Sequence, residues 1–403
     1  MNRTKSMLTV VAVTALMATS ACAANSGGGG SGPVVLGASL SLTGPLGTFG
    51  PLQQIGYEQA IKDVNDAGGL KIGGTSRTVE LKVLDNRSDP NLAGSQAREL
   101  ILKDGAVGLL GPCSTPMVIP VAQVADSQKV PLITSCAPVG AFKDANQAGW
   151  QYSWDMFFSE NDQAAKAAKI IGSASSNKKV AVFTDTEPDG IAQRPLYIAA
   201  AEAAGQQVVG DYSFPPGTSD FSAFLNDAKG KGAELVIAQI IPPDGIALWK
   251  QMRGLGFSPK VAYITKAAAT GGWPQALGPL ANGTVGDTFW SPEIGDPVST
   301  KTIQSTLESK VNNIADLSFA AFSLTVANVM LDGISTAGST DPGKINDAIG
   351  KTDKEYALGK LTFQNHAATT PLIITQWQAG GKAVYLDPPA QGAQLQVPVA
   401  GLA

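Results

Sequence analysis

From Val34 onward, short runs of apolar and β-branched residues alternate with stretches of helical periodicity. "VVLGASLSL" predicts a strand, and apolar residues recur at helical spacing over 51–66. "TVELKVLD", a helix over 91–103 with Asp89 as N-cap, "AVGLLG", a helix over 116–128 and "VPLIT" follow in order. Because parallel strands need crossovers, this order predicts a parallel sheet with helices on both faces.

The same pattern restarts after Tyr152 and predicts a second lobe of the same kind. The expected helices and strands are 162–171, "KKVAVFTD", 191–204, "QQVVGDYSF", 221–229, "ELVIAQI", 245–255 and "KVAYIT". The tail then changes rhythm, with helices expected near 300–311, 319–334 and 343–349, "GKLTF", and a hairpin in "PLIITQWQAGGKAVYL" that turns at Gly380-Gly381.

These patterns predict an α/β protein of two doubly wound parallel-sheet lobes, joined by a hinge that the chain crosses more than once. We expect lobe 1 to consist of 33–155 and 290–370, and lobe 2 of 156–289 and 371–403. In open sheets of this class, ligands bind at the carboxyl ends of the strands. The residues that follow each strand are therefore the first candidates for function.

The first 32 residues have a different character. Arg3 and Lys5 precede an apolar run of about twelve residues, too short to span ~30 Å of hydrocarbon, so 1–21 is expected to be a signal peptide. The small residues before Cys22 resemble the lipobox of bacterial lipoproteins, which implies that Cys22 is acylated. An ordinary signal with an incidental cysteine is the alternative. The glycine-rich segment 22–32 is expected to be a flexible tether, so the lobes would be held outside the cytoplasm at a membrane surface.

Composition and charge narrow the function classes. Apolar residues at 44% and charged residues at 15% predict a filled globular core. Removal of the signal leaves 27 basic against 33 acidic residues, a formal charge of −6. The longest basic run is Lys178-Lys179, so no nucleic-acid partner is expected. No later stretch reads as long and apolar enough to span a membrane.

Two loops at predicted strand ends are rich in small and hydroxyl residues. "PCSTP" follows "AVGLLG", and "SCAPVG" follows "VPLIT". The helix after the first loop opens at Ser114 or Thr115, where unpaired amides favour an anionic group. For either hydroxyl alone, helix capping is the simpler interpretation, but the facing pair of loops favours a binding site. Cys113 and Cys136 are either a disulfide or two buried free thiols.

Four segments carry a specific resemblance. "GASLSLTGPLGTFGPLQQIGYEQAIKDVNDAGGL", "LKVLDNRSDPNLAGSQARELI", "GLLGPCSTPMVIPVA" and "VPLITSCAP" resemble the successive signatures of the type I periplasmic binding proteins, in particular the branched-chain amino-acid group that serves ABC importers. The similarity runs from Val34 to about Leu386 and is strongest through Pro138. It implies the two-lobed fold, a small-molecule ligand and an ABC permease as partner.

The resemblance also assigns residues of the first lobe. Ser114, Cys136 and Ala137 match positions that bind the ligand's carboxylate. Phe49 matches an aromatic residue that covers the ligand. Pro138 departs from the family, which usually has a hydroxyl there, and proline offers neither a hydroxyl nor an amide hydrogen. If Cys113 and Cys136 end neighbouring strands, a bridge between them would pin the two carboxylate-binding loops.

In the second lobe the departures bear on the ligand. The family's aromatic positions are occupied by Asp189 and Ile241, and Lys266 lies where an acid for the ligand's ammonium is expected. A zwitterion in a closed cleft needs a partner for each charge. If Asp189 replaces the missing acid, the ligand is an amino acid. If Asp189 is only a turn residue in "EPDG", a carboxylate without an α-amine is expected, paired with Lys266.

Catalytic signatures are sparse. There is one histidine, His366, and the chain has no G-x-S-x-G elbow, phosphate-binding loop, H-E-x-x-H motif or Cys/His metal spacing. We therefore expect a receptor without catalytic residues, cofactor or metal. A secreted hydrolase that uses two acids is the alternative from another class.

Overall fold

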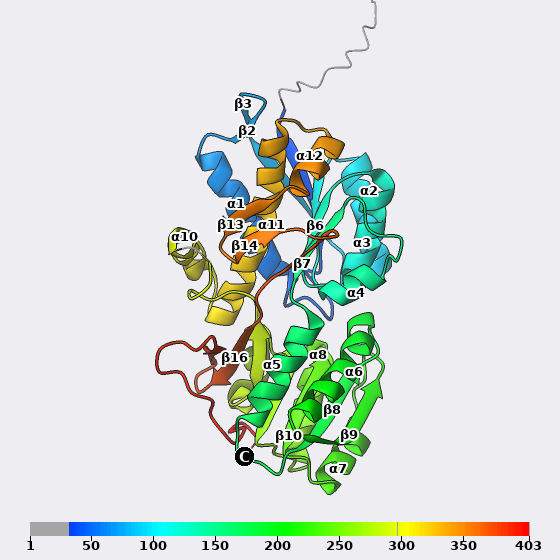
Figure 1. The fold of residues 1–403 in the computed structure, drawn as a ribbon, viewed down its shortest axis with the longest axis vertical. Coiled ribbons are helices and arrows are strands. Elements are labelled where there is room, and N and C mark those ends of the chain that lie inside the picture. The colour runs from blue at the N-terminus through cyan, green and yellow to red at the C-terminus, as the bar shows by residue number, and fades with distance from the viewer. Residues whose placement is uncertain (1–31, 296, 403) are drawn as a thin grey trace, which may run out of the picture. The chain divides into compact units, whose positions relative to one another are not determined.

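Most of the strands form two large sheets, of six and seven strands, and Figure 1 shows their arrangement in the computed structural model. The structure describes residues 32–295 and 297–402. The signal peptide, most of the tether and Cys22 lie outside the described residues, so the prediction of a lipid anchor stays a prediction.

The first sheet is wholly parallel, as predicted, with strand order β15-β7-β6-β5-β1-β4. Its strands are β1 (Val34–Leu40), β4 (Val79–Asp85), β5 (Gly108–Leu110), β6 (Leu132–Thr134), β7 (Ser153–Phe157) and β15 (Ala367–Thr369). The central strands β5 and β6 are buried at every position, which fits a sheet covered on both faces.

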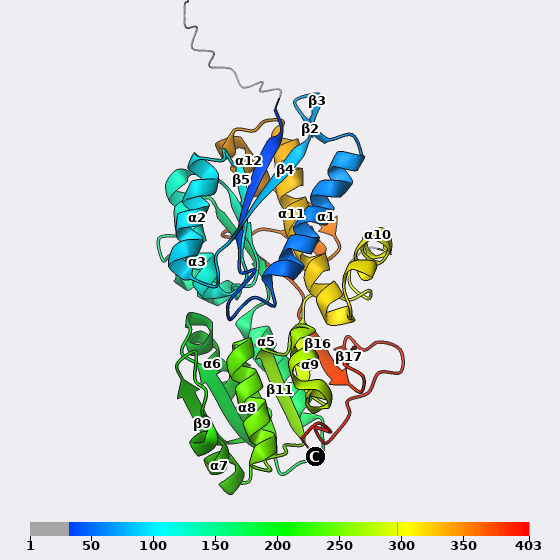
Figure 2. The same ribbon diagram turned by 180° about the vertical axis from the view of Figure 1, so that it is seen from behind.

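Four helices cover this sheet. On one face α1 (Gly50–Asp66) packs along α11 (Ile314–Ala337), and on the other α2 (Pro90–Leu102) packs along α3 (Thr115–Gln128) (Figure 2). The predicted start of α2 is confirmed: Asp89 accepts hydrogen bonds from the amides of Asn91 and Leu92, and Pro90 is the first helical residue.

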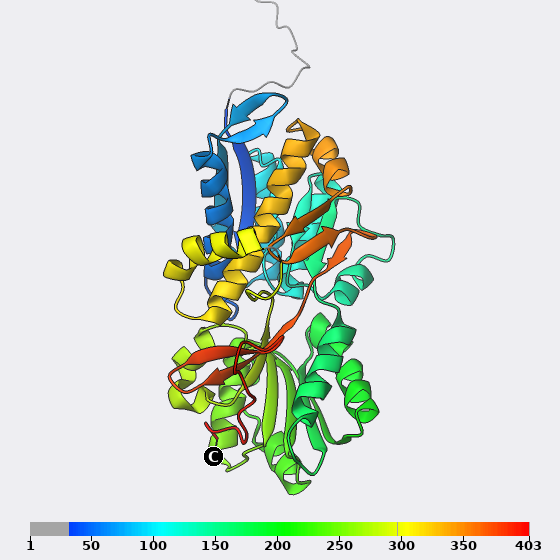
Figure 3. The same cartoon turned by 60° about the vertical axis from the view of Figure 1, so that its left-hand side comes forward.

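The second sheet has the order β17-β16-β12-β11-β10-β8-β9. Its parallel strands are β8 (Lys179–Asp185), β9 (Gln207–Phe214), β10 (Leu235–Ile240), β11 (Val261–Lys266) and β12 (Val285–Thr288). The predicted hairpin, β16 (Ile373–Gln378) with β17 (Lys382–Asp387), adds two antiparallel strands at the edge (Figure 3).

The core of the second sheet follows from the alternation of side chains along its strands. In β10, Leu235 and Ile237 pack into one apolar cluster, while Val236 and Ala238 pack into another. The helices α5 (Glu160–Gly172) and α6 (Pro188–Ala203) cover one face, and α8 (Pro242–Gly254) and α9 (Gly272–Leu277) cover the other (Figures 1 and 2). The continuous apolar run "ELVIAQI" is thus a central parallel strand.

The remaining elements are short or peripheral. They are β2 (Leu70–Ile72), β3 (Thr75–Arg77), α4 (Val139–Asp144), α7 (Ser222–Gly230), α10 (Pro297–Leu307), α12 (Pro342–Ile349), β13 (Asp353–Tyr356) and β14 (Gly359–Thr362). β2 pairs with β3, and β13 with β14, in two small antiparallel sheets.

The chain passes between the two sheets after β7, after β12 and after β15. The sequence patterns did not identify β7 or β12 as strands. β7 reads "SWDMF" and β12 reads "VGDT", so neither shows an apolar run or a clean alternation. We propose that each sheet with its helices forms one lobe, with boundaries close to those expected from the sequence. β7 belongs to the first sheet, so the first boundary is placed after Phe157 and not at 155.

One expectation from composition needs correction. Among the described residues, α11 is long and apolar enough to cross a membrane. However, 83% of its most apolar window is buried inside the protein. The helix is apolar on all sides because it lies in the core, against the first sheet and α1.

Candidate functional site

A cavity of about 40 Å³ is lined by residues from the carboxyl ends of strands in both sheets. Phe49, Cys113, Ser114, Cys136 and Pro138 come from loops around the first sheet. The second sheet together with α5 and α6 contributes most of the polar lining. The cavity therefore lies where an open parallel sheet places its ligands, and both sheets contribute to it.

Ser114 presents an unused hydroxyl to this cavity. It is the N-cap residue of α3, but its side chain makes no capping hydrogen bond, and its buried Oγ has no partner. The buried Oγ1 of Thr115 also lacks a partner, although Thr115 does not line the cavity. The capping interpretation is therefore wrong for the Ser114 hydroxyl. What Ser114 offers is a hydroxyl beside the positive end of a 14-residue helix.

A disulfide joins the two loops of the first lobe. Cys113 and Cys136 are bonded, with their Cα atoms 4.9 Å apart. Both cysteines line the cavity. The loop that carries Ser114 is therefore tied covalently to the loop that carries Cys136 and Pro138.

Three residues that line the cavity have a positive φ angle, a backbone conformation that residues other than glycine rarely adopt. Ser114, Cys136 and Lys266 line it with φ angles of +81°, +65° and +65°. Each such residue costs on the order of 1 kcal/mol or more. Strain of this kind is characteristic of binding sites, where the surrounding structure holds a side chain or amide in a required direction.

An apolar wall of phenylalanines encloses part of the cavity. Phe49 stacks on Phe319 with ring centroids 5.5 Å apart, and Phe289 contacts Phe319 edge-on at 5.6 Å. Phe157 and Phe158, at the end of β7, complete the wall. An apolar ligand group would be sheltered from water here.

The second lobe contributes a compact group of charges. Lys266, at the end of β11, places its Nζ 2.5 Å from an oxygen of Glu187 and 3.1 Å from Oδ2 of Asp189. The side chains of Lys266 and Asp189 are 10% and 6% exposed. Burial opposes the charge of Lys266, but Asp189, Glu187 and Asp185 more than offset it, and the pKa of Lys266 ends above its ordinary value.

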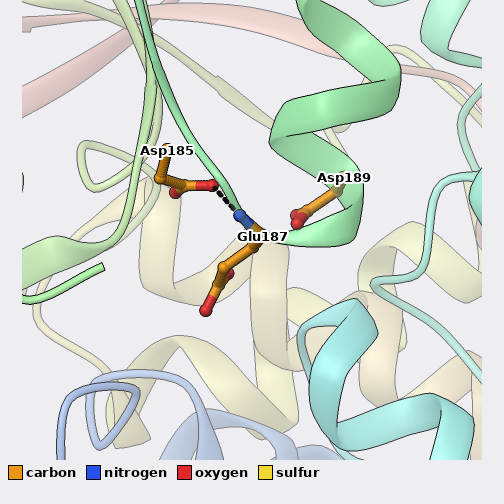
Figure 4. A group of neighbouring side chains, drawn as sticks. All are labelled: Asp185, Glu187 and Asp189. Carbon is orange, nitrogen blue, oxygen red and sulfur yellow. Dashed lines mark hydrogen bonds between the residues drawn. The ribbon is translucent and has the colours of Figure 1, made fainter. Parts of the chain in front are cut away.

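Three carboxyl groups act on this ammonium, and Figure 4 shows how Asp185, Glu187 and Asp189 lie relative to one another. Ligand atoms of Asp185, Glu187 and Asp189 all lie within 4.8 Å of one another. Asp189 lies in the first turn of α6 with a buried side chain, so it is not a turn residue, and its Oδ1 has no partner. We assign no metal to this group, because the ammonium of Lys266 already serves as its counter-ion.

Asp185 ends β8 and is fully buried. Its Oδ1 accepts a hydrogen bond from the amide of Glu187 at 3.1 Å, and its Oδ2 has no partner. Burial raises the pKa of Asp185 to about 7, although the charge of Lys266 pulls the pKa down. The negative charges of Asp189 and Glu187 add to the rise.

A second buried carboxylate, Asp287 of β12, lies against the cavity in a fully bonded network. Its Oδ2 accepts hydrogen bonds from Tyr263 at 2.6 Å, from Gln163 at 2.6 Å and from Thr265 at 2.9 Å. Burial raises the pKa of Asp287, while these three donors lower it. This network occupies the carboxylate with protein donors, so Asp287 differs from Asp189, which keeps one oxygen unbonded.

The structure brings five of the eight predicted ligand-binding residues together. Phe49, Ser114, Cys136, Asp189 and Lys266 line the cavity. Thr115, Ala137 and Ile241 are buried near strand or helix ends but do not line it.

Other lining residues were not anticipated from the sequence. They are Phe157, Phe158, Gln163, Gln193, Gln239, Thr265, Ala269, Asp287, Phe289 and Phe319. Gln239 and Thr265 lie on β10 and β11 and are detectable by the rule that strand ends carry function. His366 lies elsewhere, half-buried and stacked on Trp154 with ring centroids 3.8 Å apart.

This chain is similar in sequence to known binding proteins. A family model described as periplasmic binding protein matches residues 33–382. A Leu/Ile/Val-binding protein homolog 3 of Brucella melitensis biotype 1 is 28% identical over 361 residues, which cover 88% of this chain and 94% of that protein.

Two solved structures share the fold. A leucine-binding protein LivK of Thermotoga maritima MSB8 has a TM-score of 0.77 and 24% identity, over 88% of this chain and 97% of that one. A solute-binding protein of an ABC transporter from R. palustris, solved with 4-hydroxybenzoate, has a TM-score of 0.73 and 21% identity, over 88% of this chain and 95% of that one.

The raised pKa of Asp185 predicts a pH-dependent penalty on stability. Its pKa is about 7 in the folded protein and about 3.9 in an unfolded chain, so the folded state binds the proton more tightly. Stability is therefore lost as pH rises from about 4 to about 7. Asp185→Asn should remove this cost, raising the free energy of unfolding at pH 8 by roughly 2 to 4 kcal/mol and changing it little near pH 4.

Thermal unfolding at pH 4, 6 and 8 measures this effect. Asp347→Asn, at an exposed site on α12, is the matched control and should give the same difference from the parent at each pH. A difference between Asp185→Asn and the parent that does not grow with pH would contradict the assignment.

Proposed function

The chain belongs to the type I periplasmic binding protein family, and we propose that it is the extracytoplasmic receptor of an ABC importer that binds a small amino acid. This family consists of solute-binding proteins rather than enzymes, so the hydrolase alternative is set aside. The ligand would occupy the cavity between the two sheets, and an ABC permease would be the partner that receives it.

The distribution of unmatched polar groups supports an amino acid. On the first lobe, the free hydroxyl of Ser114 and the positive end of α3 suit a carboxylate. On the second lobe, Asp189 and Glu187 carry two negative charges against the single positive charge of Lys266, and Asp189 keeps one oxygen unbonded. The surplus of negative charge suits an ammonium group. This pairing of an anion site with an acid surplus is the observation that carries the proposal.

The phenylalanine wall supports an apolar side chain on that amino acid. Phe49, Phe157, Phe158, Phe289 and Phe319 offer aromatic surface and no charge. A branched or aromatic side chain placed there would gain about 1.5 to 3 kcal/mol from removal of its surface from water.

A carboxylate that lacks an α-amine is the second candidate. Lys266 lines the cavity and carries a positive charge, and the R. palustris protein with the same fold was solved with 4-hydroxybenzoate. We favour the amino acid because the charge of Lys266 is already offset by Asp189 and Glu187.

Lobe closure follows from the location of the cavity. A ligand that contacts both lobes binds most tightly when they are together, so its binding shifts the population towards the closed state. A lipid on Cys22 would keep this receptor at the membrane surface beside its permease.

Calorimetric titration of the purified protein tests the ligand class. We expect leucine or phenylalanine to bind at least tenfold more tightly than 4-methylpentanoate or 3-phenylpropanoate, which have the same carbon skeletons without the amine. The amine should contribute because it meets the unbonded oxygen of Asp189. Tighter binding of the acids would favour the second candidate, and no binding of either class would contradict the proposal.

Ser114→Ala should weaken binding of the preferred ligand by about 1 to 2 kcal/mol, because one hydrogen bond to the carboxylate is lost. The same titration measures this loss. Ser305→Ala, on the exposed side of α10, serves as the control and should leave the affinity unchanged. Equal affinities for the two variants would mean that the carboxylate does not bind at the start of α3.

A further inference from the structure

We propose that Glu187 is a positioning residue that prevents Lys266 from acting as a counter-ion for the ligand, and thereby sets the preference for amino acids over the corresponding acids without an amine. This inference rests on the function proposed above and assigns the origin of its selectivity. Glu187 itself does not line the cavity.

The contacts of Lys266 are the first step. Lys266 lines the cavity, yet its Nζ contacts Glu187 more closely than Asp189, at 2.5 Å against 3.1 Å. Glu187 is the residue before α6, and its side chain is 14% exposed. The ammonium is therefore held by a carboxylate from outside the cavity lining.

The charge balance is the second step. With Glu187 charged, Lys266 and Glu187 cancel, and the charge of Asp189 is available for a ligand ammonium. If Glu187 were neutral, Asp189 would be the only charged contact left to the Lys266 ammonium. The charges of Lys266 and Asp189 would then cancel, and the attraction of Asp189 for a ligand ammonium would be lost.

The other hydrogen bond of Asp189 agrees with this division, in which Glu187 balances Lys266 and Asp189 is left for the ligand. Gln239 donates to Oδ2 of Asp189 at 3.1 Å, the same oxygen that Lys266 contacts. Oδ1 is left without a partner. The protein thus satisfies one oxygen of Asp189 from its own donors and leaves the other for a donor on the ligand.

Glu187→Gln tests the proposal, since glutamine keeps the shape and an acceptor oxygen while it removes the charge. Calorimetry would compare leucine with 4-methylpentanoate, and phenylalanine with 3-phenylpropanoate, in the parent and the variant. We expect the ratio of amino-acid to des-amino affinity to fall by about tenfold or more, mostly through weaker amino-acid binding.

Glu202→Gln, at an exposed position of the same helix, is the matched control and should keep the parent ratio. Lys266→Met covers the case in which Glu187→Gln fails to fold, and it should raise the ratio because no protein ammonium then competes with the ligand amine for Asp189. A ratio that stays within about twofold of the parent in the folded variant overturns the inference. Failure of the parent to bind any of the four compounds would instead overturn the proposed function.

A separate contact at the edge of the cleft supports a second inference. Oδ1 of Asp316, in the first turn of α11, accepts a hydrogen bond from the amide of Gly271 at 2.7 Å. Asn313 caps α11 and donates to Oδ2 of the same carboxylate at 2.7 Å. Asp316 belongs to the first lobe and Gly271 to the second, so this bond joins the lobes directly.

Two glycines allow the lobes to approach this closely. A Cβ on Gly271 would lie 2.3 Å from Nδ2 of Asn313, and one on Gly272 would lie 2.7 Å from Cγ2 of Thr48. Gly271 has φ of −59°, an ordinary helical value, so its backbone does not require glycine. Glycine is required because there is no room for a side chain between the lobes at this point.

We infer that Asp316, Gly271 and Gly272 form a latch that favours the closed state without touching the ligand. Gly272→Ala should then act as a wedge that disfavours closure. Small-angle X-ray scattering without ligand should give a larger radius of gyration than for the parent, and calorimetry should show affinity weakened by about fivefold or more.

Gly254→Ala is the matched control, because nothing lies within 4 Å of its added Cβ. It should keep the parent's radius of gyration and affinity. If Gly272→Ala gives the same radius of gyration and affinity as Gly254→Ala, the inference of a latch is wrong. If Gly272→Ala does not fold, Gly271→Ala gives the same test, because its Cβ would meet the side chains of Asn313 and Asp316 in the first lobe.

Discussion

The central constraint on this protein is that a buried charge needs a partner. Lys266, Glu187 and Asp189 are held together in a site that excludes most water, where an unpaired ion would cost several kcal/mol. One ammonium faces two carboxylates there, and Asp185 avoids adding a third full charge because burial raises its pKa to about 7. The small excess of negative charge that remains is what a positively charged ligand group would complete. The proposed ligand class and the predicted pH dependence both rest on this group of charges.

Much of the fold could be predicted because the chain is locally consistent. "ELVIAQI" predicts a buried strand and is the central strand β10, and Asp89-Pro90 predicts the start of α2 that the structure has. β7 and β12 could not be predicted in this way. Each is short and carries an aspartate, and each is a strand only because neighbouring strands complete its hydrogen bonds. These two strands also lead into crossings between the sheets, so their residues serve the cavity as well as the core.

The candidate site was predictable where it depends on a single strand end. Ser114, Asp189 and Lys266 each follow or end a strand, and the parallel order brings those ends to one place. The partnership of Lys266 with Glu187 depends on two loops separated by 79 positions, and no periodicity reports it. Phe319 was hidden for a different reason. It belongs to a helix that is apolar on every side, so its sequence context does not distinguish a cavity wall from core.

The two lobes contribute to recognition in different ways, and this difference explains why the site suits a receptor. In the first lobe a disulfide ties the loop of Cys113 to the loop of Cys136, and Ser114 begins a helix in a conformation that its neighbours must enforce. A carboxylate can therefore bind to it with little reorganisation. The second lobe presents charged side chains whose balance is complete only when a further cation arrives. In the proposed function the ligand's carboxylate meets the first lobe and its ammonium meets the second, so that closure would join the two requirements. A molecule with a carboxylate but no ammonium would bind the first lobe and leave the negative charge of the second lobe without a partner.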